Sequence, residues 1–535
     1  MNHALLPVLI ILSTGALSVG SLAAEGKAPR RPNLVFIIDD QHSSDMLGCS
    51  GNPDIQTPNL DKFAREGVRF SHCVSNSPVC TPYRGILLSG QHPLNCGAIQ
   101  NDLQILPGNG SYLPEILRDA GYHTGYYGKW HLYGGDRERG IPAGPYRYGF
   151  DHEFLTNNCT LLFDAAHAYY WDQDGKAKKL YGDWEPYAQA RQAMEFMGRN
   201  GDKPFALFIA WHPPHNWATS AQEGYDAPKD LLALYDPARL TLRPTVKDTP
   251  RVRRMYQGHM AMISGIDRAF GMLMEKLKER GLADNTIVVF TADHGDMLQS
   301  YGWPGNKGRA EHTSCRVPLL VRWPAQLKPG TSDLLMGTLD LMPTLLGLMN
   351  LPVPASCQGR NAAEAVLQGR DDGVDAVPLF YLPLNWRGVY THRYTYSVAL
   401  HDPNEANVPG GKKTFNVLYD RQTDPWETRN LFDAPEAAGI REKLHAQTIG
   451  MMKRFGDTGL RCDEIIRRVV REEDLPAVMM PLARRPDGWN GRLKGRPVDL
   501  LQSPEPSSSG VPPEDTGGQD ARATIHPASA PAQLK

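Results

Sequence analysis

Short apolar runs alternate with amphipathic segments through the first two-thirds of the 535-residue chain, and this alternation constrains the fold more than any other feature. The apolar runs predict buried strands at 34–38, 123–127, 205–211, 286–291 and 317–322. The segments between them predict helices at 58–66, 113–120 and 255–277. Because strands and helices take turns along the chain, we expect an α/β fold with a mostly parallel sheet covered by helices on both faces.

The pattern changes after about residue 375. Residues 388–400 and 415–419 have the pattern of hairpin strands, and residues 436–455 have that of one amphipathic helix. We therefore expect a large α/β domain at 30–375 and a smaller C-terminal α+β subdomain at 376–475. Residues 500–535 are rich in Pro, Ser and Gly and lack apolar periodicity, which predicts a disordered tail.

The first residues have the pattern of a secretory signal. His3 precedes an apolar run at 4–19, and small residues follow at Ala23 and Ala24 before the chain turns basic. A signal peptide at 1–24 would export the protein to the periplasm or to the medium. A membrane anchor is the alternative, although the run is short for a bilayer, and no later stretch is apolar for long enough to span one.

Composition limits the partners and the cysteine chemistry. The formal net charge is -2, without the basic surplus that nucleic-acid-binding proteins usually carry. Eight cysteines in a chain of this length do not make a disulfide scaffold, and none has the pair spacing of a zinc site. One or two bridges could form in an oxidising compartment, with a pairing that the sequence leaves open.

Ionisable residues follow four of the predicted strands, at the point where each strand ends. They are Asp39-Asp40, Lys129 with His131, His212 with His215, and Asp293-His294, with Lys307 a little downstream. Any one of these groups could belong to an ordinary turn or a solvated loop. Ligands of open α/β sheets bind outside the carboxyl ends of the strands, so the four groups together predict one crevice that also receives Cys80 and Arg84.

The charges in this crevice predict both a cation and an anionic substrate. Asp39, Asp40 and Asp293 would repel one another without a metal, and oxygen ligands on loops favour Ca²⁺, with Mg²⁺ as the second choice and zinc a weaker one. Three basic side chains face the same crevice, which fits a tetrahedral oxyanion held against the metal. These basic residues are Arg84, Lys129 and Lys307.

The segment Cys80-Thr81-Pro82-Tyr83-Arg84 has the C-x-P-x-R form and resembles the signature of type I sulfatases, which belong to the alkaline-phosphatase-like superfamily. Further segments are similar to the same family, at 39–40, 57–61, 128–131, 293–295, 316–320 and 418–431. The resemblance covers roughly residues 30 to 455. It implies a sulfuric ester hydrolase of the arylsulfatase type, with an alkaline-phosphatase-like fold.

The resemblance also implies what the site residues do. A converting enzyme would oxidise Cys80 to formylglycine, whose hydrate has one hydroxyl to attack sulfur and a second whose deprotonation expels sulfate. The implied metal ligands are Asp39, Asp40, residue 80, Asp293 and His294. Arg84 and Lys129 would hold the hydrate, and His131 would take the proton whose loss lets sulfate leave. His215 and Lys307 would bind sulfate and assist the departing alcohol, with His212 as the alternative to His215. Two segments depart from the family pattern, at 41–44 and 307–312.

Three functions remain open at this point. The first is hydrolysis of sulfate esters on carbohydrates or on aryl groups. The second is a phosphonate or phosphate diester hydrolase of the same superfamily, and the third is a sulfated-glycan-binding protein in which Cys80 is never converted. Aromatic residues between 169 and 187 either stack on sugar rings or pack within a long insertion. They are Tyr169, Tyr170, Trp171, Tyr181, Trp184 and Tyr187.

Overall fold

The computed structural model describes residues 31–480, apart from 107, 109, 136, 161, 217–223, 372 and 401–414. The predicted signal at 1–24 and the predicted tail at 500–535 therefore lie outside the described residues. A large sheet has the strand order β10-β2-β9-β8-β1-β7-β3-β4-β5-β6. Its strands are β1 (Asn33–Asp39), β2 (Val68–Val74), β3 (His123–Lys129), β4 (Glu153–Asn157), β5 (Tyr169–Trp171), β6 (Lys178–Leu180), β7 (Phe205–Ala210), β8 (Thr286–Ala292), β9 (Leu319–Arg322) and β10 (Gly330–Gly337).

The centre of the sheet is parallel, as the alternation predicts. β1 pairs in parallel with β7 on one side and with β8 on the other, and β7 continues in parallel to β3. β9 runs antiparallel to both of its neighbours, β2 and β8, and the β5–β6 hairpin adds antiparallel strands beyond β4. The predicted mostly parallel sheet is confirmed, with antiparallel exceptions outside the central four strands.

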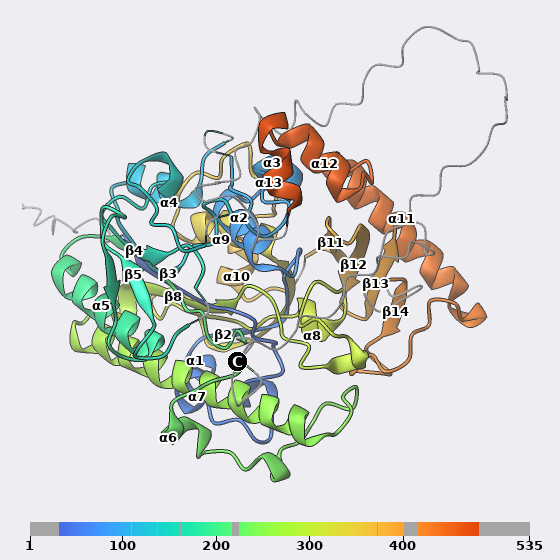
Figure 1. Cartoon of the computed structure of the whole chain (residues 1–535), viewed down its shortest axis with the longest axis horizontal. Helices are drawn as coiled ribbons and strands as arrows, with labels where there is room; N and C mark the ends of the chain where they lie inside the picture. Colours follow the sequence, from blue (N-terminus) through green and yellow to red (C-terminus); the bar gives the residue numbers. More distant parts are fainter. Residues whose placement is uncertain are drawn as a thin grey trace, which may run out of the picture. The chain divides into compact units, whose positions relative to one another are not determined.

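Helices cover both faces of this sheet (Figure 1). The burial of the β1 side chains shows which helices close each face. Leu34, Phe36 and Ile38 point into one apolar cluster, whereas Val35 and Ile37 point into another. The first cluster is closed by α2 (Cys80–Ser89), α4 (Leu113–Asp119), α9 (Thr338–Leu348) and α10 (Ala363–Gln368). The second is closed by α1 (Pro58–Glu66), α5 (Glu185–Asn200) and α7 (Pro250–Glu279). A strand that is apolar on both faces is buried on both, which explains its continuous apolar sequence.

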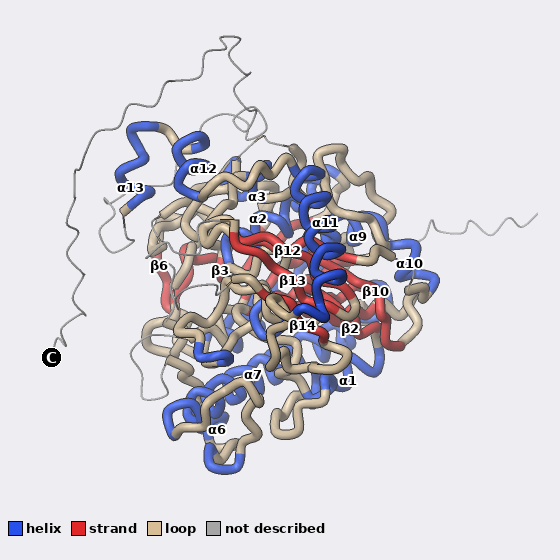
Figure 2. The backbone as a smooth tube through the Cα atoms, turned by 90° about the vertical axis from the view of Figure 1, so that its right-hand side faces the viewer, coloured by secondary structure: helices blue, strands red, loops and turns tan. Residues whose placement is uncertain are grey.

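A second, antiparallel sheet makes up the C-terminal subdomain. Its strands are β11 (Ala376–Tyr381), β12 (Trp386–Thr391), β13 (Tyr394–Ala399) and β14 (Val417–Asp420). The helix α11 (Ala438–Phe455) packs against β12 and β13, and Figure 2 shows it lying across this sheet. The predicted hairpin strands and amphipathic helix are thereby confirmed.

The remaining helices are short. They are α3 (Pro93–Cys96), α6 (Lys229–Leu232), α8 (His312–Cys315), α12 (Cys462–Val469) and α13 (Leu475–Met479). α12 and α13 pack on the loop around residues 94–103, where Ile99 and Leu103 are fully buried. Among the described residues, no helix combines the length and apolar character needed to cross a membrane.

Two expectations about side chains are settled by burial. Tyr169 and Trp184 are each only 4% exposed, so they pack inside the protein and are unable to stack on a sugar. Trp171 stays partly exposed on β5, with its indole N–H donated to the Glu138 carbonyl. All eight cysteines lie among the described residues, and each of them is free.

Candidate active site

The carboxyl ends of the four central strands place most of the predicted site residues. Asp40 directly follows β1, and Asp293 directly follows β8, its neighbour in the sheet. Lys129 ends β3, and His215 lies in the loop after β7. Since these strands are parallel neighbours, their last residues meet at one edge, as the sequence predicts.

Cys80 comes to the same place from a helix. It is the first residue of α2, behind an extended Val79, and Arg84 lies one turn later on the same side of the helix. The Cys80 Sγ lies 3.2 Å from His294 Nε2, 3.2 Å from Lys307 Nζ and 3.6 Å from Lys129 Nζ. Burial raises the pKa of the Cys80 thiol, but Lys129, Lys307 and His294 lower it more, so that it stands well below its ordinary value.

Asp40, Cys80, Asp293 and His294 form a fully buried group whose ligand atoms all lie within 4.8 Å of one another. Burial and the charge of Asp40 raise the pKa of Asp293 to about 6. Carboxylates packed this closely repel one another, so the donor set fits a hard divalent cation with the thiol in the place of an oxygen ligand.

Asp39, the fifth predicted ligand, is not a member of this group. Its Oδ2 lies 2.6 Å from His42 Nδ1, and its buried Oδ1 makes no hydrogen bond within the described part of the chain. His42 in turn lies 2.9 Å from the Met46 carbonyl, so it holds Asp39 against the loop. Asp39 as a metal ligand stays a prediction, supported by this unpartnered oxygen.

The buried cations are tied to the carboxylates. Lys129 Nζ contacts Asp40 Oδ2, and Arg84 Nη2 lies 3.4 Å from Asp40 Oδ2 and 3.2 Å from Asp293 Oδ2. Arg84 Nη1 also donates to the Lys129 carbonyl at 2.9 Å. Burial and Cys80 raise the pKa of Asp40, yet Lys129, His215 and Lys307 lower it more, to a net value below its ordinary one. Asp40 is therefore ionised at neutral pH.

His215 and Lys307 are the half-buried members of the site, whereas Cys80, Lys129 and His131 are each about 1% exposed. Lys307 Nζ lies 2.9 Å from His215 Nε2, and burial together with Lys307 lowers the pKa of His215 to about 4. His212 is fully buried and lies 2.8 Å from Glu185, on α5. The geometry thus places His215, and not His212, beside Lys307.

His131 is surrounded by residues that the sequence did not single out. Its Nε2 lies 3.0 Å from Asp102 Oδ1, and Arg137 binds both oxygens of Asp102, at 2.8 and 3.1 Å. Burial lowers the pKa of His131, but Cys159 and the hydrogen bond of Asp102 raise it more, to about 10. Burial raises the pKa of Cys159, yet His131 and Lys129 lower it to about 6. Asp102, Arg137 and Cys159 lie in loops without a motif, so no sequence signal could have found them.

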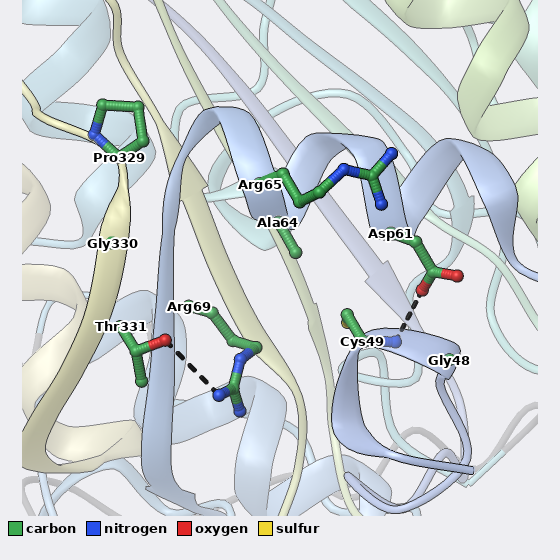
Figure 3. Close-up of a pocket in the computed structure, with 9 residues that line it drawn as sticks. All are labelled: Gly48, Cys49, Asp61, Ala64, Arg65, Arg69, Pro329, Gly330 and Thr331. Atoms are coloured by element: carbon green, nitrogen blue, oxygen red, sulfur yellow. Dashed lines mark hydrogen bonds between the residues drawn. The ribbon is translucent and has the colours of Figure 1, made fainter. Parts of the chain in front are cut away.

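An open pocket of about 520 Å³ lies elsewhere (Figure 3). It is bounded by α1 and by the first residues of β2 and β10, with Arg65, Arg69 and Thr331 along its wall. These are the amino ends of the two strands, so this pocket is separate from the crevice at the carboxyl ends. Arg69 already contacts the Thr331 hydroxyl at 3.4 Å, and Asp61 accepts from the Cys49 amide at 2.7 Å.

Two family models match the chain. The model described as Sulfatase matches residues 32–351, and that described as N-sulphoglucosamine sulphohydrolase, C-terminal, matches residues 301–454. The first match covers the large sheet and the crevice, and the second covers the C-terminal subdomain.

Individual proteins match over most of the chain as well. An ulvan-active sulfatase of Formosa agariphila is 32% identical over 477 residues, which cover 85% of this chain and 88% of the relative. An endo-4-O-sulfatase of Bacteroides thetaiotaomicron is 28% identical, covering 81% of this chain and 96% of the relative. A crystal structure from Bacteroides fragilis, assigned as the sulfatase yidJ, is 29% identical with a TM-score of 0.71, covering 82% of this chain and 98% of that chain. The chain therefore belongs to the sulfatase family, within the alkaline-phosphatase-like superfamily, and is a sulfuric ester hydrolase.

Proposed function

We propose that this chain hydrolyses sulfate esters on carbohydrates, through a formylglycine made from Cys80 and with a divalent cation, Ca²⁺ before Mg²⁺. The observation that carries the proposal is the buried group of Asp40, Cys80, Asp293 and His294, whose sulfur Lys129 and Lys307 both contact. A thiol buried only for packing needs no cations around it. A nucleophile that attacks an anionic ester needs them, because they stabilise the charge that grows in the transition state.

The positions of the site residues suggest a different role for each. The Cys80 Sγ stands where the oxygens of the hydrated aldehyde would lie, and Lys129 is within 3.6 Å to hold them. Arg84 reaches Asp40 and Asp293, so its support of residue 80 acts through these carboxylates. His215 and Lys307, on the exposed side, would bind the sulfate and assist the alcohol as it departs, while the buried His131 would take the proton that lets sulfate leave.

The cation would be held by Asp39, Asp40, residue 80, Asp293 and His294. When bound, it would neutralise the carboxylates and draw electron density from the sulfate oxygens. Oxygen donors on loops favour Ca²⁺, although the imidazole of His294 is an uncommon ligand for so hard an ion. A converting enzyme is the partner that the Cys80 motif requires during maturation.

The names of the relatives support a carbohydrate substrate. One relative is ulvan-active and another is an endo-4-O-sulfatase, and both align with more than four-fifths of this chain. An aryl sulfate then serves as a convenient but simpler substrate. Export follows from the apolar run at 4–19, and fractionation of expressing cells would test it.

Two measurements test the proposal: the mass of the peptide that contains residue 80, and the rates of hydrolysis of three kinds of substrate. Peptide mass spectrometry of the active protein should find an aldehyde or its hydrate at position 80, and full activity with an unmodified thiol would overturn the mechanism. Side-by-side rates on sulfated oligosaccharides, an aryl sulfate and an aryl phosphonate monoester should favour the sulfates. Faster turnover of the phosphonate would establish the superfamily alternative instead, and binding of sulfated glycans without turnover would establish a glycan-binding protein.

A further inference from the structure

His131 has a second ionisable partner that the proposed function does not use. Its Nε2 lies 3.0 Å from Asp102 Oδ1, and both side chains are at most 3% exposed. With Nε2 occupied by a carboxylate, Nδ1 is the nitrogen left for chemistry. Nδ1 is buried without a nitrogen or oxygen partner within the described residues, and the ring lies beside the thiols of Cys80 and Cys159.

The backbone links the same residues to the start of α2. The Thr81 hydroxyl donates to the His131 carbonyl at 2.8 Å, and the Asp102 amide lies 3.4 Å from that hydroxyl oxygen. The Thr81 amide donates to the side chain of Asn101 at 3.0 Å. Asp102 is thus tied by hydrogen bonds to the residue that follows Cys80 as well as to the His131 ring.

Arg137 supplies the charge that Asp102 needs. A buried carboxylate without a cation would take up a proton and lose its strength as an acceptor. Arg137 prevents this with two hydrogen bonds, from Nε to Oδ1 at 2.8 Å and from Nη2 to Oδ2 at 3.1 Å. The bidentate geometry also sets the plane of the carboxylate, and with it the direction from which His131 is held.

We infer that Asp102, held by Arg137, is a positioning residue for His131: it orients the ring so that Nδ1 faces residue 80, and it stabilises the positive charge that the ring acquires with a proton. This inference rests on the proposed function. In that reaction the alcohol leaves first. Sulfate leaves second, when His131 takes a proton from the remaining hydroxyl of residue 80 and the carbon–oxygen bond to sulfate breaks with its electron pair on sulfate, restoring the carbonyl. Asp102 therefore acts on the second step.

The loop that carries Asp102 does not depend on the carboxylate for its fold. Ile99 and Leu103 are buried in the cluster formed with α12 and α13 and hold the loop from both sides. Asp102 has a φ of +68°, a left-handed conformation that asparagine also tolerates well. Asp102→Asn thus removes the charge with little disturbance of the backbone.

The test measures aryl sulfate turnover of Asp102→Asn in protein with Cys80 fully converted. We expect kcat to fall about 10²- to 10³-fold and KM to fall with it, so that kcat/KM for alcohol release stays within about threefold of wild type. Because the alcohol leaves before the impaired step, the variant should release a burst of about one alcohol per site and then turn over slowly, which a merely structural loss would not produce. Arg137→Gln should show the same burst with a smaller loss of kcat, and it serves as the second variant if Asp102→Asn fails to fold.

The matched control is Asp457→Asn, which removes another buried aspartate that binds an arginine, Arg387. It should lower stability without a burst and without a change in kcat per folded molecule. A kcat within threefold of wild type in either active-site variant, or a loss of kcat without a burst, would overturn the positioning role. A wild-type chain with converted Cys80 and no turnover would instead overturn the proposed function, and the positioning role with it.

Discussion

Buried charges are arranged differently at the edge of the large sheet and in the C-terminal subdomain. In the subdomain two aspartates each have their own arginine: Arg387 binds both oxygens of Asp457, and Arg393 binds both oxygens of Asp420. At the edge of the large sheet, Asp40 and Asp293 share Arg84, and Asp40 also contacts Lys129. In the first arrangement each carboxylate has its own arginine, whereas in the second two neighbouring carboxylates share one.

The pKa values of the buried aspartates also differ between the two regions. Burial raises the pKa of Asp457, but Arg387 lowers it more, to a net value below the ordinary one. For Asp293, burial and Asp40 raise the pKa to about 6, and neither His294 nor Arg84 reverses this. A lowered pKa means that the folded state stabilises the charge, and a raised one means that it does not. The charge of Asp457 in the subdomain thus contributes to stability, whereas Asp293 in the crevice carries its charge at a cost to stability.

The largest expected effect separates activity from stability at the crevice. Cys80→Ala should lower turnover by at least about 10⁴-fold, because it removes the nucleophile, and should leave the thermal midpoint close to that of wild type. Cys357→Ala, at a half-buried free cysteine away from the crevice, should retain activity. Steady-state rates and thermal denaturation check both variants, and substantial turnover by Cys80→Ala would contradict the assignment of the nucleophile.

The next effect concerns the subdomain alone. Arg387→Ala should lower the free energy of unfolding by about 3–5 kcal/mol, because it leaves the buried Asp457 without its partner. Arg393→Ala is the matched control: the Arg393 side chain is 47% exposed, so its removal should cost much less than that of Arg387. Urea unfolding measures both values. Equal losses in the two variants would mean that burial does not distinguish these pairs.

Once the metal is removed, neutralising an aspartate should change stability with opposite sign in the crevice and in the subdomain. Chelation should abolish activity and lower the free energy of unfolding by about 3 kcal/mol relative to protein with cation at 100 times its Kd. In chelated protein, Asp293→Asn should raise stability, because it removes one of two repelling carboxylates, whereas Asp457→Asn should lower it. Calorimetry with the metal content verified distinguishes the cases. A chelated Asp293→Asn variant less stable than chelated wild type would contradict the cation requirement.

The part of the site that could be predicted from sequence is the part that local rules fix. A buried parallel strand is a short apolar run, and its next residue lies at the sheet edge, so the order of residues along the chain is enough to place Asp40, Asp293 and Lys129 together. The metal group and the cations around Cys80 followed from that rule and from the family resemblance. The strand orientation of β9 could not be predicted, because a short apolar run has no direction.

What could not be predicted depends on contacts between loops. Asp102 and Arg137 are 35 positions apart and lie in irregular segments, so no periodicity relates them to each other or to His131. The aromatic residues between 169 and 187 show a second reason why sequence prediction fails. Their composition was compatible with sugar stacking, but Trp184 at the start of α5 is buried against α7. Residue type alone does not tell a packed aromatic side chain from an exposed one.

The smallest expected effect concerns the pH dependence of stability, which compares the pKa values of a histidine in each region. His131 in the crevice has a raised pKa, whereas His92, at the contact with the subdomain, has its pKa lowered to about 3, first by burial and then by Arg387. His92 lies between Phe380 and Phe455, with ring centroids at 4.2 and 5.0 Å. The unfolded chain binds a proton here below about pH 6.5 and the folded chain does not, so stability is present above that pH and falls by about 1.4 kcal/mol per pH unit as the pH drops toward 3. His92→Phe preserves the ring stack and should reduce this slope by one proton between pH 4 and 6, measured by urea unfolding, with no change of slope above pH 7. An unchanged acid slope would show that His92 is already protonated in the folded protein.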